Sequence, residues 1–413
     1  MNRRITLRIG AISLIILLTF GLAGCGNQGK SYYKDAIKSY NQGDYEAAAE
    51  SFAKAIELKD DNADYYIDYG YCLIELENYT EAESMFRKAI LDKENSIVDK
   101  NNKKAYRGLG IMNYLEGNYE SALEDFNKAM EYTSLKEYDV DILSYMGAAN
   151  LQLGNYEEAL ANFTRIIQDE PKNIIALKGR GEVNYQLGNY EDSITDYTTA
   201  KKLKKDDYDV YFGLYNAYTA LGDSENGNDI LEQAASLPIK DDEDKFNLAK
   251  IHYYQGNNTQ ALDGFKLASE QGVVESYFYL GDIYLADGDD TTAVYYYELY
   301  LKEAQPKSAS FYSKLATSYL NIKSYDQALD MIHKGLTYAG SMDKQNLLRN
   351  EIIAYEHLGD YESAYTKMQA YLSSYPEDEE AKRELEFLAT RQGNAVQGEN
   401  SEDSQTSDEI VKP

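Results

Sequence analysis

The sequence predicts an all-α fold, a solenoid of about ten stacked helix pairs, and two observations carry that prediction. A motif typified by GNYEEA recurs, in close or weaker copies, at residues 43, 77, 117, 154, 188, 222, 256, 288, 323 and 359. The base period is 34 residues. Apolar and small residues at helical spacing flank each copy, and self-similarity at this period is typical of stacked repeats.

Each copy of the motif predicts a joint between two helices. Its glycine suits the left-handed backbone at the end of one helix, and the Asp or Asn that follows suits the N-cap of the next. At Asn78 and Asn155 a glutamate stands three residues on, which adds a capping box. The joints therefore divide the chain into helix pairs.

Small and aromatic residues alternate on the faces of these helices. Tyr66, Tyr69 and Gly70 precede one joint, and Phe86 lies between two alanines after it. The small residues allow two helices to approach closely, and the rings fill the space beside them. Neither helix could bury such a face alone.

With these features the sequence resembles the tetratricopeptide repeat family over about residues 29–378. The resemblance implies a right-handed superhelix of helix-turn-helix repeats that binds peptides on its concave side. Three departures stand out: the chain has no tryptophan, Gly227 replaces a packing alanine, and the joint at 323 lacks its glycine. Insertions at Asn95–Lys103 and Ser134–Asp141 predict lengthened loops.

The N-terminus has the order of a secretion signal. Arg3, Arg4 and Arg8 precede an apolar stretch, and LAGC closes it at Cys25. LAGC resembles the lipobox of bacterial lipoproteins, which implies cleavage after Gly24 and a diacylglyceryl group on Cys25. The alternatives are an uncleaved membrane anchor and a phosphate-binding loop, GCGNQGKS. That loop needs a parallel sheet, which helical repeats do not provide.

The predicted organisation follows from these segments. It comprises a signal peptide at 1–24, the lipidated cysteine and a tether at 25–31, the repeat array at 32–376, a capping helix at 377–392 and a disordered acidic tail at 393–413.

The charge of the chain excludes several classes of partner. The formal net charge is −29, and removal of residues 1–24 takes away three arginines and no acid. Such a surface repels phosphate backbones and anionic headgroups, so we expect no nucleic acid and no nucleotide, and attachment to the membrane through the lipid. We expect the extracytoplasmic face of a cell membrane, and the Lys-, Asn-, Ile- and Tyr-rich composition favours a Gram-positive one.

We expect no catalytic centre, metal or cofactor. The three histidines fall in different repeats and lack metal-site spacing. Cys72 has no partner for an intramolecular disulfide once Cys25 is lipidated, and its apolar neighbours predict a buried thiol.

The resemblance places candidate binding residues on the first helix of each pair. Aromatic groups beside dispersed charges suit peptide recognition, although such rings also pack between helices. The candidate aromatic residues are Tyr71, Tyr114, Tyr185, Phe212, Phe246, Tyr253 and Phe278. The candidate cations are Lys104, Arg107, Lys178, Lys250 and Arg349, with Glu182 and Asp282 between them.

These observations predict a non-catalytic, lipid-anchored scaffold that binds an unidentified protein or peptide. Two alternatives remain open. One is an envelope assembly factor of the kind that helps to build outer-membrane barrels or pili. The other is a cell-wall glycan-binding protein, because aromatic grooves also bind sugars.

Overall fold

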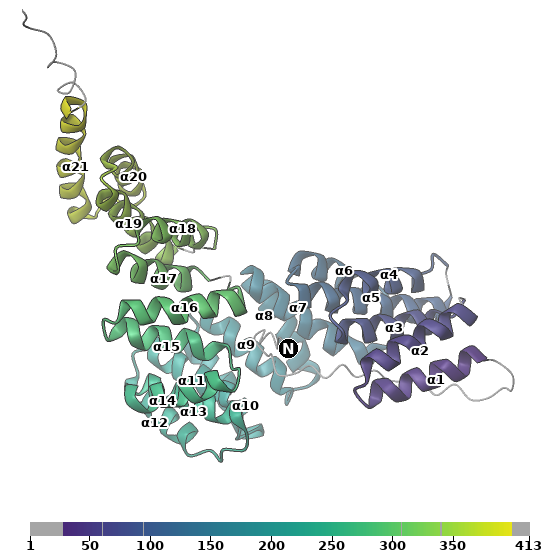
Figure 1. Cartoon of the computed structure of the whole chain (residues 1–413). Coiled ribbons are helices and arrows are strands. Elements are labelled where there is room, and N and C mark those ends of the chain that lie inside the picture. Colours follow the sequence, from purple (N-terminus) through teal and green to yellow (C-terminus); the bar gives the residue numbers. More distant parts are fainter. Residues whose placement is uncertain (1–27, 60, 94, 307, 339–340, 399–413) are drawn as a thin grey trace, which may run out of the picture. The chain divides into compact units, whose positions relative to one another are not determined.

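The computed structural model describes residues 28–398 apart from 60, 94, 307 and 339–340, and without the side chains of 341–343 and 392–398. Within these residues the chain forms 21 α-helices, one short 3₁₀ helix and no strand (Figure 1). The predicted all-α solenoid is confirmed. The chain divides into two compact units after Leu237. We call residues 28–237 the N-terminal array and residues 238–398 the C-terminal array, and describe each separately.

The N-terminal array contains six helix pairs. Its first helices are α1 (Gln28–Asn41), α3 (Ala63–Glu75), α5 (Ser96–Glu116), α7 (Asp139–Leu153), α9 (Ile174–Gln186) and α11 (Tyr208–Ala220). Its second helices are α2 (Tyr45–Leu58), α4 (Tyr79–Ala89), α6 (Tyr119–Glu131), α8 (Tyr156–Asp169), α10 (Tyr190–Leu203) and α12 (Ser224–Ala235). The 3₁₀ helix η1 (Lys136–Tyr138) precedes α7. Because α1 begins at Gln28, the last four residues of the expected tether are helical.

The C-terminal array contains four helix pairs and a terminal helix. Its first helices are α13 (Asp242–Tyr254), α15 (Glu275–Ala286), α17 (Ala309–Asn321) and α19 (Ser341–Leu358). Its second helices are α14 (Asn258–Glu270), α16 (Asp290–Ala304), α18 (Tyr325–Leu336) and α20 (Tyr361–Ser374). The terminal helix α21 (Glu379–Gly398) packs on α20 and extends six residues beyond the capping helix expected at 377–392.

The joints have the backbone that the motif predicts. The eight joint glycines have φ between 74° and 81°. Lys323 takes the same left-handed conformation, with φ 63°, and its N–H donates to the carbonyl of Leu320 at 2.9 Å. Gly117 donates to Tyr114 in the same way at 3.0 Å. The missing glycine at 323 therefore leaves the form of the joint unchanged.

Asn78 forms an N-cap but not the complete capping box, because its backbone N–H donates to the Leu73 carbonyl instead of Glu81. The Asn78 side chain accepts from the Glu81 N–H and donates to the Glu81 carboxylate at 2.8 Å. Asn155 makes no side-chain cap bond, and its amide donates instead to the Asn150 side chain at 3.3 Å. The expected capping box at Asn155 is therefore wrong.

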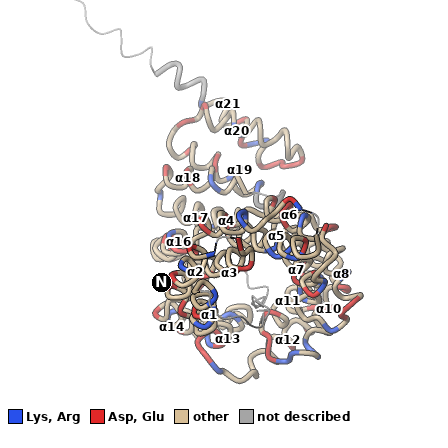
Figure 2. Tube along the Cα trace, turned by 90° about the vertical axis from the view of Figure 1, so that its right-hand side faces the viewer, with Lys and Arg blue, Asp and Glu red and all other residues tan. Residues whose placement is uncertain are grey.

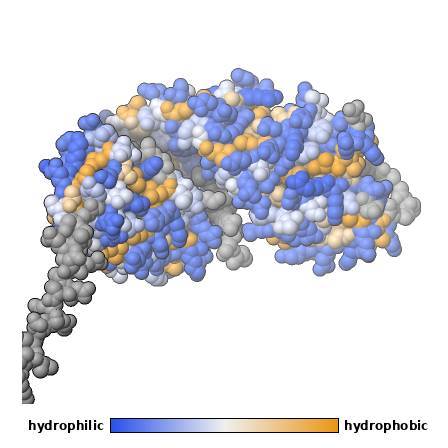
Figure 3. Space-filling model, turned by 90° about the horizontal axis from the view of Figure 1, so that it is seen from above, coloured by the Kyte–Doolittle hydropathy of each residue, from blue (hydrophilic) through white to orange (hydrophobic). Residues whose placement is uncertain are grey.

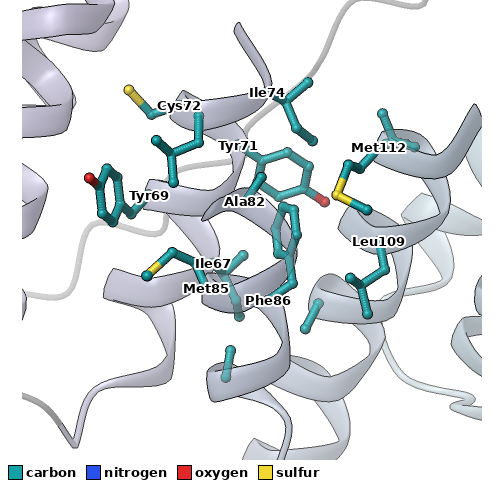
Figure 4. Packing of buried hydrophobic residues seen from close by; sticks show 14 of the residues in the cluster. Ile67, Tyr69, Tyr71, Cys72, Ile74, Ala82, Met85, Phe86, Leu109 and Met112 are labelled. Atoms are coloured by element: carbon teal, nitrogen blue, oxygen red, sulfur yellow. The ribbon is translucent and has the colours of Figure 1, made fainter. Parts of the chain in front are cut away.

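Several core rings pack against glycines of the first helices. Phe86 of α4 is fully buried among residues of α3 and α5 (Figure 4). A Cβ added at Gly70 would lie 2.7 Å from this ring, and one added at Gly108 would lie 2.3 Å from it. Phe163 relates to Gly147 and Gly179 in the same way. The small residues in the motif thus make room for a ring between successive helix pairs.

The first insertion is helical, which corrects the prediction of a loop at Asn95–Lys103. Asn95 caps α5 by accepting from the N–H groups of Ile97 and Val98 at 3.1 and 3.0 Å. Asn102 exchanges hydrogen bonds with the backbone of Leu91, and Lys103 is buried against Asp139. These bonds extend α5 by more than two turns toward its N-terminus. The second insertion contains η1 and the start of α7.

The surface of the described chain is mixed. In the view of Figure 3 hydrophobic residues form narrow bands between hydrophilic ones. Among the described helices, none is both long and apolar enough to cross a membrane.

Candidate functional site

The candidate site is the side on which successive first helices meet, which we call the inner face. In the N-terminal array each of α3, α5, α7 and α9 contacts the next first helix directly, in addition to the second helices beside it. Basic and acidic residues are interspersed along the described chain (Figure 2). Side chains of the inner face therefore lie within reach of the neighbouring repeat.

The three candidate cations of the N-terminal array all form ion pairs between repeats. Lys104 of α5 lies 3.0 Å from Asp64 of α3. Lys178 of α9 lies 2.8 Å from Asp209 of α11 and also contacts Asp207. Burial opposes the charged form of both lysines, but the facing carboxylates outweigh it and leave each pKa raised. These cations hold neighbouring helices together.

Arg107 makes the most enclosed of these contacts. Its side chain is 4% exposed, and Nε lies 2.5 Å from Asp141 of α7. Nη1 donates to the Tyr71 hydroxyl at 2.8 Å, and the guanidinium lies 5.1 Å from the centre of the Tyr138 ring. Burial opposes the charge of Arg107, yet Tyr71 and Asp141 raise its pKa. Arg107 therefore joins three successive first helices.

The structure divides the candidate aromatic residues into two groups. Tyr71, Phe212 and Phe246 are buried, at 4%, 7% and 9% exposure, so their rings pack the core and offer little surface to a partner. Half-buried rings of the inner face remain accessible in part: Tyr114, Tyr185, Tyr253 and Phe278. Sequence spacing identified the helical face but not the part of it that the next helix covers.

In the C-terminal array Asp282 of α15 gathers a cluster that the sequence predicted only in part. Its carboxylate, 5% exposed, accepts from Tyr253 at 3.1 Å and from Tyr297 at 2.5 Å. Lys314 of α17 lies 2.5 Å from it and 4.7 Å from the centre of the Phe278 ring. Lys314 and Tyr297 were missed because neither lies in the register of the candidate residues.

The other candidate cations of the C-terminal array also lie beside packing groups. Lys250 is half-buried, 5.9 Å from the centre of the Phe246 ring. Arg349 of α19 pairs with Glu384 of α21 at 2.7 Å. Glu182, in the N-terminal array, accepts from Gln186 and from Tyr197.

Sequence reasoning also missed two tyrosine–carboxylate pairs between α1 and α3. The Tyr33 hydroxyl donates to Asp68, and the Tyr40 hydroxyl donates to Glu75 at 3.3 Å. The signal that could have found them is the spacing of seven residues within each helix, which keeps both pairs on one face.

The described histidines and cysteine lie in no metal-binding cluster, because the described residues contain no group of three or more His, Cys, Asp or Glu side chains that could hold a metal. His333 contacts the buried Glu351 at 3.0 Å, and His357 stacks on Tyr325. Cys72 is fully buried, as expected, and burial raises the pKa of its thiol to about 12. Cys25 lies outside the described residues.

A solenoid of helix pairs whose inner face is lined by rings and charges defines a repeat protein of the interaction type. Tetratricopeptide repeat profiles match the chain at residues 40–100, 146–208 and 246–309. These segments of the chain are tetratricopeptide repeats.

Relatives of known sequence match a shorter part of the chain. A protein SGT1 homolog from Bos taurus is 34% identical over 103 residues, and one from Homo sapiens is 35% identical over 111 residues. These matches cover 25% and 27% of this chain. The chain spans only 28% and 27% of the length of these two relatives.

Solved structures match longer parts of the chain. A tetratricopeptide repeat protein from Parabacteroides merdae has a TM-score of 0.49 at 20% identity, over 60% of this chain and 94% of that one. YrrB, described as a tetratricopeptide repeat protein with an unusual peptide-binding site, has a TM-score of 0.38 at 21% identity, over 46% and 92%. PilW, a type IV pilus biogenesis factor, has a TM-score of 0.46 at 16% identity, over 55% and 99%.

Proposed function

We propose that this protein is a lipid-anchored, extracytoplasmic scaffold that binds a protein or peptide partner on its inner face and catalyses no reaction. One observation carries the proposal: in the N-terminal array, successive first helices contact one another and present half-buried rings, such as Tyr114 and Tyr185, among charged groups. Rings of this kind supply contact area at low cost in side-chain entropy.

The sequence alone supports the proposed lipid anchor. The order of arginines, apolar stretch and LAGC supports cleavage before Cys25 and attachment of lipid to its thiol. Two or more acyl chains give stable membrane attachment, whereas one chain binds only marginally.

Two measurements test the anchor: partitioning of the protein into a detergent phase, and the mass of the intact protein. We expect the wild-type chain to enter the detergent phase with the mass of a lipidated, cleaved protein, and the Cys25→Ser variant to lose the lipid. Cys72→Ala is the matched control, since Cys72 is buried, and it should keep the lipid. A Cys25→Ser chain that still partitions with detergent at full length would favour the uncleaved anchor instead.

Site-specific photocrosslinking in intact cells tests the inner face. A photoreactive amino acid at Gln186, exposed and eight residues after Lys178 on α9, should label a discrete protein. The same group at Glu158, exposed on the second helix α8, should not. Labelling from Glu158 alone would move the binding site to the outer helices. Labelling of wall polymer from Gln186 would favour the glycan-binding alternative.

A further inference from the structure

The inner face of α1 and α3 carries the same arrangement twice: a tyrosine hydroxyl that donates to a carboxylate. Tyr33 and Asp68 form one hydrogen-bonded pair, and Tyr40 and Glu75 form a second. Both members of the second pair stand seven residues after those of the first. Seven residues of helix advance about 10 Å along the axis. Two equivalent tyrosine–carboxylate pairs are therefore displayed about 10 Å apart.

Neither carboxylate is ion-paired within the described part of the chain. Asp68 and Glu75 accept from tyrosine hydroxyls only, while the nearby Lys104 bonds to Asp64. Lys30 and Lys34 of α1 are exposed and bond to neither carboxylate. Asp68 and both tyrosines are half-buried, and Glu75 is exposed. The face thus offers two carboxyl groups and aromatic edges to an approaching group. Burial raises the pKa of both carboxyl groups, so a nearby cation would favour their ionised form.

In two other places in the chain, a carboxylate and nearby aromatic rings together hold a cation. Asp282 accepts from Tyr253 and binds the Lys314 ammonium, which lies over the Phe278 ring. Asp141 binds Arg107, whose guanidinium lies over Tyr71 and Tyr138. In both places a neighbouring first helix supplies the cation. Between α1 and α3 no cation of the described chain forms an ion pair with either carboxylate, and Lys104, which is bonded to Asp64, acts on Asp68 only through its charge.

We propose that this face of α1 and α3 binds two Lys or Arg side chains, at positions i and i+3, of a partner segment in the polyproline II conformation. Three residues of polyproline II make one turn and advance about 9 Å, so the side chains at i and i+3 lie on one side at a spacing close to that of the two pairs. Each cation would gain a carboxylate and an aromatic ring. The net charge of −29 also favours encounter with a basic partner. The inference rests on the proposed function and names the chemistry of its partner.

The test is binding of a labelled peptide, Lys-Pro-Pro-Lys with blocked ends, to the full chain in detergent micelles, measured by fluorescence anisotropy at low salt. The prolines keep the peptide extended, and Glu-Pro-Pro-Glu is the control peptide. The measurement is made at pH 8, above the pKa of about 7 that burial gives Asp68. At this pH Asp68→Asn with Glu75→Gln removes both negative charges while keeping an acceptor for each tyrosine. We expect this double variant to raise the Kd about tenfold, a loss typical of two partly exposed ion pairs.

A matched variant separates this site from net charge. Glu120→Gln with Glu124→Gln removes two exposed carboxylates from the second helix α6, and we expect its Kd to stay within about twofold of the wild-type value. Circular dichroism checks that both double variants remain folded.

Four results would overturn the proposal: no binding of the lysine peptide, equal binding of the glutamate peptide, equal loss in both double variants, or no loss in the variant at Asp68 and Glu75. Binding that appears only after removal of residues 1–24 would overturn it as well, because the occupant would then be the chain's own Arg3, Arg4 and Arg8. Crosslinking from Gln186 that persists in any of these cases would leave the proposed function standing.

Discussion

At some positions of this chain, the aromatic ring packed against a residue limits how large that residue can be. Gly108 has no room for a methyl group, because a Cβ there would lie 2.3 Å from Phe86. Gly227, which replaces a packing alanine of the repeat, is different, since its nearest neighbour would be Tyr215 at 3.6 Å. Packing therefore requires glycine at position 108 but not at position 227.

Alanine at these two glycines should have opposite effects. Gly108→Ala forces the Phe86 ring to move and should lower the free energy of unfolding by about 1–3 kcal/mol. Gly227→Ala adds ordinary contact and removes the entropic cost of glycine in a helix, so it should raise that free energy by about 0.5 kcal/mol. Urea unfolding followed by circular dichroism gives both values. Destabilisation by both substitutions would show that the space at Gly227 is not free.

Asp68 makes stability depend on pH. Burial and the nearby Asp64 raise its pKa to about 7, although the Tyr33 hydrogen bond opposes them. Between pH 4 and 7 the folded chain therefore binds more protons at this group than the unfolded chain does. This contribution to stability is present at low pH and is lost as the pH rises through about 7.

Asp68→Asn should flatten the pH profile of the unfolding free energy between pH 4 and 7. The amide still accepts from Tyr33 but cannot titrate, and a single proton changes the slope by at most about 1.4 kcal/mol per pH unit. Asp223 is a useful comparison, because hydrogen bonds from Asn226 lower its pKa and move its effect below this window. An unchanged slope in Asp68→Asn would mean that Asp68 is ionised throughout.

Between elements, side-chain bonds connect successive first helices as well as apolar packing. The Arg107 to Asp141 pair and the Lys178 to Asp209 pair each bridge neighbouring repeats. Removing one member of a buried pair leaves an uncompensated charge, and this costs more than loss of an exposed pair. The inner face therefore contributes to the stiffness of the array.

Arg107→Met should lower the free energy of unfolding by about 3 kcal/mol, because it leaves the Asp141 carboxylate without its partner and removes one of the two hydrogen bonds of the Tyr71 hydroxyl. The matched control is Arg87→Met, which breaks an exposed pair with Glu83 within α4 and should cost at most about 0.5 kcal/mol. Chemical unfolding of the three proteins measures the difference. Equal costs would show that the buried pair adds nothing beyond its methylene packing.

The sequence was a good guide to the elements and a weaker one to the inner face. Joints and ring positions follow from local rules, so period and capping residues identified all ten helix pairs. The extension of α5 was missed because its support comes from Leu91 and Asp139, outside the insertion. Burial of Tyr71 and Phe212 was missed because one helical face contains both covered and open positions, and only the neighbouring helix decides between them.

At the scale of the whole chain, we expect the free energy of folding to be spread over the repeats and not concentrated in one central core. Each repeat packs mainly on its neighbours, so the free energy of folding is close to a sum of repeat and interface contributions. One continuous core cluster runs from Ala36 to Tyr145, and another from Leu143 to Val183, both within the N-terminal array. Other clusters, from Phe246 to Ile283 and from Ala293 to Leu347, lie within the C-terminal array.

A fragment of residues 28–237 should therefore fold without the rest of the chain, since it keeps six complete helix pairs and their clusters. We expect a helical circular dichroism spectrum and a cooperative urea transition. A fragment of residues 28–221 is the sharper control, because it removes α12 and exposes the face of α11 that carries Ala217, which is fully buried in the chain. It should unfold at lower urea concentration or aggregate. If the two fragments were equally stable, the pairing of α11 with α12 would contribute little, and a helix pair could not be the unit in which this array folds.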